Sequence, residues 1–586
     1  MADETAPARL PRTVLTRRAV AERIARGEVI VLHGRLVYKL DNWIHKHPGG
    51  DLAILHFVGR DAKSEIEVYH SEDTIRTLMR RFAIAQLAPD DATDVARGHV
   101  YRPLMPPIQL GYRNGRLDHP DAQLSAWAAH ERTHPGEPRP ACFPLPLDLL
   151  EPPPGRLSLL HEARIAAAFE RLHGRIKDAG LYTLRPSGYA RECARYILFG
   201  TLSYACFQTA RSVQGVAATA LFLLSAVFLG IVWHQMAFTA HDAGHSGISH
   251  MYWLDRFIGV LVASYVGGLS LLWWCDSHDI HHLVTNHPEH DPDIQHMPIF
   301  AVSPRFVGAD GDVARDVAQG GGGRGAGELG AAPPEAATEA HARARTAAAR
   351  ATPPAPAAPS LPHPTPALWS SYYRRVLAID AVARILLQYQ HRLFFVIMSI
   401  ARFNLYALSY SFLLLRAKRD RWLLIEGVGV LVFWAWFGGL VLPALPSWKM
   451  LVAYLLISHI VTSPLHIQIV LSHFAQDTTD LGPQECFASR QVRTTMDVQC
   501  PSYMDFVHGG LHMQVTHHLF PRLPRHNLRE ARDRYVVPFC KEWGLIYEEM
   551  QFVPGNGKVL RRLQEVSDQV RFLFCVADAQ ARGKLP

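Results

Sequence analysis

Long apolar runs constrain what this chain of 586 residues can fold into more than any other feature of its sequence. A helix needs about 20 apolar residues to cross the hydrocarbon core of a bilayer. Ser212–Phe238 meets that length, and a shorter apolar partner, Tyr196–Thr209, precedes it. Leu423–Pro446 and Met450–Ser472 form a second pair joined by a very short turn. These runs predict about four transmembrane helices in two hairpins.

Basic residues in front of each pair predict that both hairpins begin and end in the cytosol, because Lys and Arg are enriched in cytosolic loops of membrane proteins. These residues are Arg191 and Arg195 before the first pair, and Arg416, Lys418, Arg419 and Arg421 before the second. Two further apolar runs, Tyr252–Cys275 and Leu393–Leu415, are interrupted by Asp, Gly, Arg and Asn. We expect these two runs to lie in the membrane interface or to re-enter without crossing.

Composition divides the chain into further parts. We expect a small α+β domain (11–95), a linker (96–155), an all-α membrane domain with interfacial helices and a histidine-rich cytosolic cap (156–550), and a C-terminal tail (551–586). The linker is rich in proline, which favours an extended chain. Residues 308–366 are dominated by Gly, Ala and Pro, so we expect disorder there. Helical spacing in Arg156–Tyr182 predicts one amphipathic surface helix.

Charge and cysteine content argue against two other classes of protein. The net charge is +7, but the Lys and Arg residues are scattered, so flanks of membrane spans explain the excess better than nucleic-acid binding does. The eight cysteines form no CxxC pair, which indicates reduced thiols facing the cytosol. The first residues lack the apolar run of a signal peptide, so we expect the N-terminal domain to remain in the cytosol.

The segment around His47 carries a haem-binding signature. Residues 47–50 spell HPGG, Trp43 precedes them, GRDA follows at 59–62, and a second histidine, His70, lies further along. This segment resembles cytochrome b5, which implies that His47 and His70 are the two axial ligands of haem b. Two imidazoles saturate the haem iron and leave no open position for oxygen, which suits electron transfer. Without this resemblance, the segment could also be an ordinary turn with histidines on the surface and no bound haem.

Three further histidine clusters follow the chain in order. The ligand candidates are His241 and His245 in HDAGH, His278, His281 and His282 in HDIHH, and Gln514, His517 and His518 in QVTHH. Side chains four residues apart lie on one face of a helix, where two imidazoles can share a metal. Imidazole suits iron, and a set of about eight ligands can hold two metal ions. Each cluster alone is weak, because HxxHH occurs by chance.

The three clusters together resemble the superfamily of membrane fatty-acyl desaturases and hydroxylases. Gln514, in place of the first histidine of the third cluster, resembles the front-end desaturases, which also carry a fused cytochrome b5 domain. The resemblance covers about Ile30–Pro89 and Tyr196–Tyr535. It implies a di-iron centre that uses O2 and is held by the clustered residues, and it adds His473 in VLSHFAQD as a further metal ligand.

Other polar residues near the clusters have less certain roles. We expect His250, His287, His290, His296, His512 and His526 to be surface groups or groups that orient the ligands. His512 stands where the family often has Asn or Gln, so its role is open. Asp242 and Asp279 either orient imidazoles or lie solvated on the surface.

The substrate is inferred from one segment. TNHPEHDPDIQHMPIFAVS, at 285–303, resembles the fungal Δ8 sphingolipid desaturases, which act on the long-chain base of ceramides. Front-end Δ6-type fatty-acyl desaturases share the clusters, and a lipid hydroxylase would use the same metal site. A haem-bearing membrane anchor that only donates electrons is a non-enzymatic alternative, but it needs no histidine clusters.

The resemblance also implies partners. The matches to GxGxxG lie in the glycine-rich run, the first starting at Gly320, and they open no βαβ pattern. Electrons are therefore expected from NADH through a separate cytochrome b5 reductase. The expected location is the endoplasmic reticulum membrane, with the haem and di-iron parts facing the cytosol.

Overall fold

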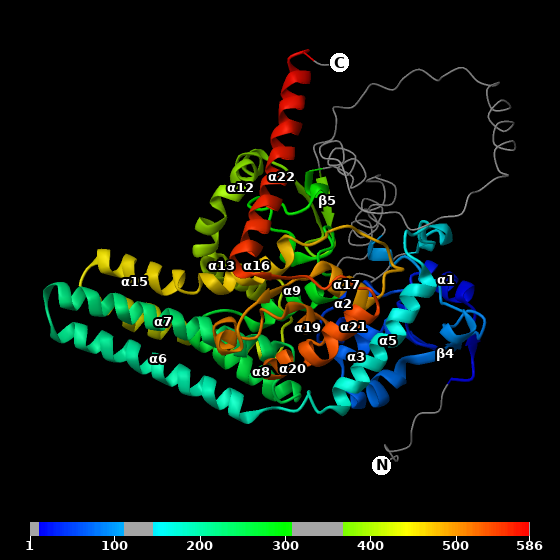
Figure 1. Ribbon diagram of the computed structural model, residues 1–586, viewed down its shortest axis with the longest axis horizontal. Coiled ribbons are helices and arrows are strands. Elements are labelled where there is room, and N and C mark those ends of the chain that lie inside the picture. Colours follow the sequence, from blue (N-terminus) through cyan, green and yellow to red (C-terminus); the bar gives the residue numbers. More distant parts are fainter. Residues whose placement is uncertain (1–10, 110–143, 308–366, 585–586) are drawn as a thin grey trace.

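The computed structural model describes residues 11–109, 144–307 and 367–584 of the chain. The predicted disordered stretch at 308–366 lies outside these residues, as does most of the predicted linker. Figure 1 shows the N-terminal part, in blue, packed against a larger helical part.

The N-terminal domain is α+β, as predicted. Its elements are β1 (Val14–Leu15), α1 (Arg17–Ala25), β2 (Ile30–His33), β3 (Leu36–Lys39), α2 (Leu52–Leu55), α3 (Lys63–Tyr69) and β4 (Ala83–Leu87). The strands form one sheet in the order β1-β4-β3-β2, in which β1 runs parallel to β4. Thr16 caps α1 because its hydroxyl accepts a hydrogen bond from the Ala19 amide at 3.2 Å. The sheet and helices enclose a core that includes Ile24, Val37 and Leu55.

The described ends of the proline-rich region differ from the prediction of an extended linker. Tyr101 and Leu104 are buried in the N-terminal domain, and the Tyr101 hydroxyl donates to the Gly59 carbonyl at 2.9 Å. Leu150 is also buried in this core. The proline residues therefore separate apolar anchors that hold both ends of the region against the domain.

The predicted amphipathic helix is present as α5 (Leu159–Asp178). Its buried face includes Ile165, Phe169 and Leu172, which pack with residues of α17 (Phe487–Thr494). Ser158 caps the helix, and its hydroxyl accepts from the His161 amide. This helix connects the N-terminal domain to the histidine-bearing part of the chain.

Among the residues that the structure describes, three helices are long and apolar enough to cross a membrane: Gly215–Gly244, Arg421–Ala444 and Trp448–Phe474. They comprise α7 (Gly215–Gly244), α14 (Arg421–Phe433), α15 (Trp448–Ile460) and α16 (Ser463–Phe474). α6 (Pro186–Ser212), which contains the shorter predicted run, is less apolar and packs along α7. Figure 1 shows α6, α7 and α15 side by side, and α7 contacts both of the others.

Both interrupted apolar runs are sharply bent. α8 (Tyr252–Val260) continues as a π-helix to Val266 and then turns by 119° into α9 (Leu271–Leu283). α12 (Ala381–Ser399) and α13 (Ala401–Leu415) meet at 76°. If each bent pair counted as one span, up to five helices could cross the membrane. The prediction that these runs do not cross stays a prediction.

The C-terminal segment is not a tail. It forms α22 (Phe552–Ala581), and Val559, Leu563 and Val566 pack it against α12 and α16. Apolar residues on one face explain this packing, and Figure 1 shows α22 in red beside α12.

The other described strands and α-helices of the larger part are short. They are β5 (Ala367–Ser370), β6 (Arg375–Ala378), β7 (Asp497–Gln499), α18 (Asp505–His508), α19 (Gln514–Leu519), α20 (Leu528–Ala531), α21 (Val537–Glu542) and β8 (Glu549–Gln551).

Candidate metal centre and haem site

Eight buried histidines from four helices converge in the middle of the molecule. Two groups have ligand atoms within 4.8 Å of one another: His241, His245, His278 and His517 form one, and His281, His473 and His518 form the other. His282 lies among them, with its Nε2 3.0 Å from Nε2 of His278 and 3.1 Å from Nε2 of His517. The three clusters and the end of α16 are therefore brought together into two adjacent groups.

The bonding of these imidazoles fits metal ligands. Burial of an unpaired polar atom costs about 1–3 kcal/mol, so a folded chain rarely leaves several of them together. Within the described residues, both ring nitrogens of His245 and Nε2 of His518 are buried and have no hydrogen-bond partner. Such nitrogens, aimed at one another from separate helices, have the donor chemistry that iron accepts.

Groups behind the histidines hold their rings in place. Nδ1 of His281 donates to Asp291 at 2.8 Å, and Nδ1 of His278 donates to Asp293 at 3.1 Å. Nδ1 of His518 donates to the side-chain oxygen of Gln491 at 2.9 Å. In this tautomer Nε2 carries the lone pair, so each ring can present it to a metal. None of these three residues was predicted from the sequence, although two of them are the aspartates of the HDPD segment at 290–293, a short distance after the second cluster.

The two aspartates inside the clusters have different surroundings. Asp242 is buried and forms an ion pair with Arg525, and it accepts a hydrogen bond of 2.6 Å from Tyr189. It is thus not solvated, and its Oδ1 lies 3.6 Å from Nδ1 of the ligand candidate His241. Asp279 lies with Oδ1 3.9 Å from Nδ1 of His245, which places it beside a ligand imidazole.

The third cluster presents its residues from a short helix. α19 begins at Gln514 and carries His517 and His518 one turn later, so all three lie within one helical turn of each other. Gln514 lines the same cavity as His241 and His278. Its position allows contact with a ligand in that cavity.

Several other histidines do not fit the expectation of surface groups. His287 and His290 are buried, and their rings stack with centroids 4.0 Å apart. His290 also meets His56 of the N-terminal domain at 4.9 Å. His512 is buried beside Asp505 at 3.2 Å, and His526 lies 3.1 Å from Glu192. The His250 ring bonds to the Tyr182 carbonyl and His296 lines the cavity.

The N-terminal domain offers a second site built from His47 and His70. Their ring centroids lie 6.1 Å apart. Nδ1 of His47 donates to the Gly50 carbonyl and Nδ1 of His70 donates to the Ile66 carbonyl, each at 3.0 Å. Burial lowers the pKa of His47 to about 4, so this imidazole is neutral at physiological pH. Two neutral imidazoles with their Nδ1 atoms engaged fit a pair of axial haem ligands.

One helix, α9, separates the two sites. Ile280 of α9 and Val284, the residue directly after it, belong to the apolar core that also contains Leu52 and Leu55 of the N-terminal domain. A methyl group built on Gly49 would lie 3.6 Å from the Asp279 carboxylate. The His47 loop therefore rests directly on the helix that carries the second histidine cluster.

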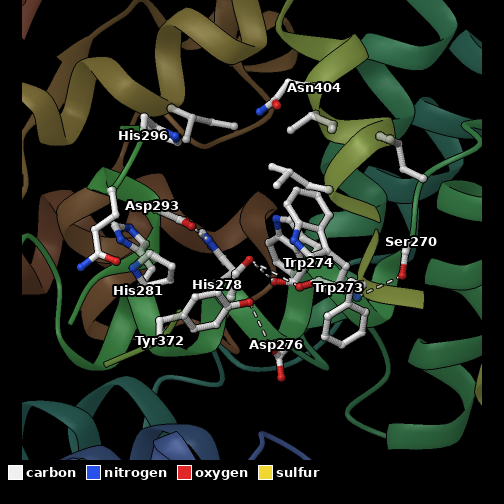
Figure 2. A pocket seen from close by; sticks show the side chains of 18 of the residues that line it. Ser270, Trp273, Trp274, Asp276, His278, His281, Asp293, His296, Tyr372 and Asn404 are labelled. Carbon is white, nitrogen blue, oxygen red and sulfur yellow. Dashed lines mark hydrogen bonds and ion pairs between the residues drawn. The ribbon is translucent and has the colours of Figure 1, made fainter. Parts of the chain in front are cut away.

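A cavity of about 1280 Å³ opens onto the metal-site histidines. His241, His278, His281 and His473 contribute to its wall, together with apolar residues such as Phe300 and Leu408. Figure 2 shows His278, His281 and Asp293 gathered at one side of it, with Trp273 and Trp274 beside them. This volume exceeds the pockets that most small ligands need and is suited to a long apolar molecule.

Comparison with known proteins gives two family matches. Residues 218–310 and 334–550 match the fatty acid desaturase family, and residues 16–88 match the cytochrome b5-like haem/steroid binding domain. The chain is 36% identical to the delta 8-(E)-sphingolipid desaturase of Emericella nidulans, with 96% of this chain and 95% of the relative covered. It is 35% identical to the protein of the same name from Komagataella phaffii, over 96% and 94%. It is 28% identical to delta(8)-fatty-acid desaturase 2 of Arabidopsis thaliana, over 91% and 89%.

Proposed function

The chain belongs to the family of membrane desaturases with a fused cytochrome b5 domain, and on this premise we propose that it introduces a double bond at position 8 of the sphingoid base of ceramides. It is an integral membrane oxidoreductase that uses electrons from its own haem domain and acts on a lipid. The full-length similarity to fungal proteins named for that reaction favours ceramide over the fatty-acyl alternative. Their names also support the E geometry for the product.

The cofactors implied by the two families are haem and iron, and the two histidine sites fit them. We assign haem b to His47 and His70. One iron is assigned to His241, His245, His278 and His517, and a second to His281, His473 and His518. His282 contacts the first group and Gln514 lines the cavity beside it, so both are candidate ligands for the pair. These residues would hold iron, which would supply the O2 activation needed to remove hydrogen from an unactivated methylene.

The protein's own residues position the reacting groups. Asp291, Asp293 and Gln491 fix the orientation and tautomer of three ligand rings. Trp274 stacks on His278 with centroids 4.4 Å apart and covers one side of the site against water. Apolar residues of the cavity hold the hydrocarbon chain against the histidines, which limits the reaction to the carbons placed there.

The source of electrons is proposed to be NADH, through a separate cytochrome b5 reductase. His47 and His70 would hold a haem that supplies one-electron transfer, and α9, which carries His278, His281 and His282, packs against this domain. The location is proposed to be the endoplasmic reticulum membrane, with both sites in the cytosol. The shared position of the histidine-bearing ends of α7 and α16, next to the haem domain, supports this orientation.

A labelled substrate tests the reaction type. The purified protein, NADH and a cytochrome b5 reductase would be supplied with a ceramide deuterated on carbons 8 and 9 of its base. Desaturation predicts a product that has lost one deuterium from each carbon, whereas hydroxylation would add the mass of one oxygen. If the ceramide gave neither product while a fatty-acyl substrate was converted, the proposal would be overturned.

A further inference from the structure

The cavity that reaches the metal-site histidines is not enclosed by the desaturase part alone. Ile44, His45, Gly50 and Asp51 of the haem domain line it together with His278 and His281. These four residues lie in the loop that contains His47 and the start of α2. The haem domain is therefore part of the wall of the proposed substrate cavity.

The wall near the haem domain is polar. The Tyr372 hydroxyl donates to Asp276 at 2.9 Å, and Arg416 lies 3.5 Å from the same carboxylate. Arg374 forms an ion pair of 2.7 Å with Asp51 of the haem domain. In Figure 2 the Tyr372 hydroxyl points toward Asp276, next to His278, and the blue ribbon of the haem domain lies on this side. We name Asp51, Asp276, Tyr372, Arg374 and Arg416 the polar rim.

The polar rim lies close to the metal site. Asp276 precedes His278 by two residues on α9, which is about 3 Å along a helix axis. The wall of the cavity also has an apolar part, which includes Phe300, Leu405 and Leu408. A lipid with its polar end at the rim and its chain along the apolar wall would present carbons near the polar end to the histidines.

The chemistry of the polar rim suits a neutral head group that both donates and accepts hydrogen bonds. Carboxylates accept from hydroxyl groups, and guanidinium groups donate to an amide carbonyl. Hydroxyls and an amide are what a ceramide has at its polar end. Asp51 and Asp276 are paired with Arg374 and Arg416, so the charges of these four rim residues balance, as a neutral head group requires.

We propose that the haem domain, through Asp51 and the adjoining loop, completes the polar rim and binds the hydroxyl and amide groups of the ceramide head group. This inference rests on the proposed function. The fused domain then has two roles, as electron donor and as one wall of the substrate site. Loss of its contact with the lipid should weaken binding without slowing haem reduction.

Cross-linking tests the contact without relying on turnover. The full-length protein in detergent or nanodiscs would be labelled with a ceramide that carries a photoreactive diazirine at its polar end. Peptide mass spectrometry is expected to find the label in the segment from Ile44 to Leu55 and in the turn that holds Tyr372. A label confined to the desaturase part would overturn the proposal.

Kinetics of Asp51→Asn provide a second readout. Loss of one hydrogen bond to a charged group is expected to raise KM for ceramide roughly tenfold. The rate of haem reduction by the reductase should not change. Asp90→Asn, an exposed aspartate of the same domain away from the cavity, is the matched control and should leave KM unchanged.

Two further outcomes separate the possible failures. Arg374→Gln breaks the ion pair with Asp51 but keeps the Asp51 carboxylate. If Asp51 served only to hold the haem domain against the desaturase part, both variants would slow electron transfer from haem equally. That result, with unchanged KM, would overturn the inference and leave the proposed function standing. A wild-type protein that neither binds nor desaturates ceramide would overturn both.

Discussion

Asp291 accepts a hydrogen bond of 2.8 Å from Nδ1 of His281. The carboxylate is fully buried and also accepts from the backbone amides of Asn286 and Asp293. It therefore both shapes the loop after α9 and fixes the ring that joins the second histidine group. The orientation of the His281 ring therefore depends on the conformation of this loop.

Asp291→Ala is expected to lower iron affinity by about 10–100-fold, because the ring of His281 loses its orienting acceptor. Iron per haem, measured by elemental analysis of the purified protein, checks this. Asp291→Asn keeps an acceptor oxygen and should lose clearly less iron. Equal iron content in wild type and Asp291→Ala would contradict the role given to this carboxylate.

Gly244→Ala should disturb the metal site sterically. A Cβ at this position would clash with the ring of Trp274, which stacks on His278 and also contacts the rings of His241 and His245. Displacement of the indole is expected to lower activity and iron content together.

Gly427→Ala is the matched control for that substitution. Its Cβ would meet nothing within 4 Å, although the residue also lies inside a helix. Replacing a helical glycine there should leave activity unchanged and stabilise the helix by about 0.5–1 kcal/mol. Thermal denaturation and the desaturation assay on both variants would separate the two cases, and similar losses in both would refute the steric argument.

Arg525→Leu is expected to destabilise the protein by about 3–5 kcal/mol, because it leaves two buried carboxylates without their partner. Arg525 pairs with Glu192 on α6 and Asp242 on α7, and all three side chains are buried. The free energy of unfolding or the thermal midpoint in detergent gives the measurement.

Arg534→Leu serves as the control, since Arg534 pairs with Glu530 at the surface. An exposed pair of this kind contributes about 0–1 kcal/mol. An Arg525 variant as stable as the Arg534 variant would show that the buried cluster is not needed for the fold.

The haem domain should lose stability as pH rises toward neutrality. Burial raises the pKa of Glu65 to about 7, while an unfolded glutamate titrates near 4.3. The folded state binds more protons between these values, so stability is full below the unfolded pKa and falls as pH rises through about 7. Glu65→Gln should remove this decline.

Loss of the haem absorbance in guanidinium chloride, measured from pH 5.5 to 8, would follow that decline. The window avoids protonation of His47, whose pKa is about 4. A wild-type midpoint that does not change with pH, or one that falls equally in Glu65→Gln, would count against the argument.

The sequence predicted those features whose signal is local. HPGG with His70, and the spacing within each histidine cluster, predicted candidate ligands for both sites, and the structure places these histidines close together. Within each cluster this follows because side chains three or four residues apart lie on one face of a helix. Their roles as ligands stay a prediction. The α+β domain and the helical membrane domain are confirmed. The long helices were also predicted from a local signal, since a run of about 20 apolar residues is long enough to cross a bilayer as a helix.

Features that depend on tertiary packing could not be predicted. The division of the histidines into two groups requires α7, α9, α16 and α19 to be placed in space. Gln491 lies far along the chain from His282, and nothing in the sequence pairs them, yet its amide donates to the His282 carbonyl at 2.7 Å. The burial of Tyr101 and the packing of α22 are likewise contacts with distant segments.

The most direct test of the function is lipid mass spectrometry in a yeast that lacks sphingolipid desaturation. The strain would express the wild-type chain, His281→Ala, or His161→Ala as a control with an exposed histidine outside the cluster. We predict long-chain bases lighter by two hydrogens with the wild type and the control, and none with His281→Ala. Unchanged bases together with newly unsaturated fatty acids, or bases with an added oxygen, would contradict this account.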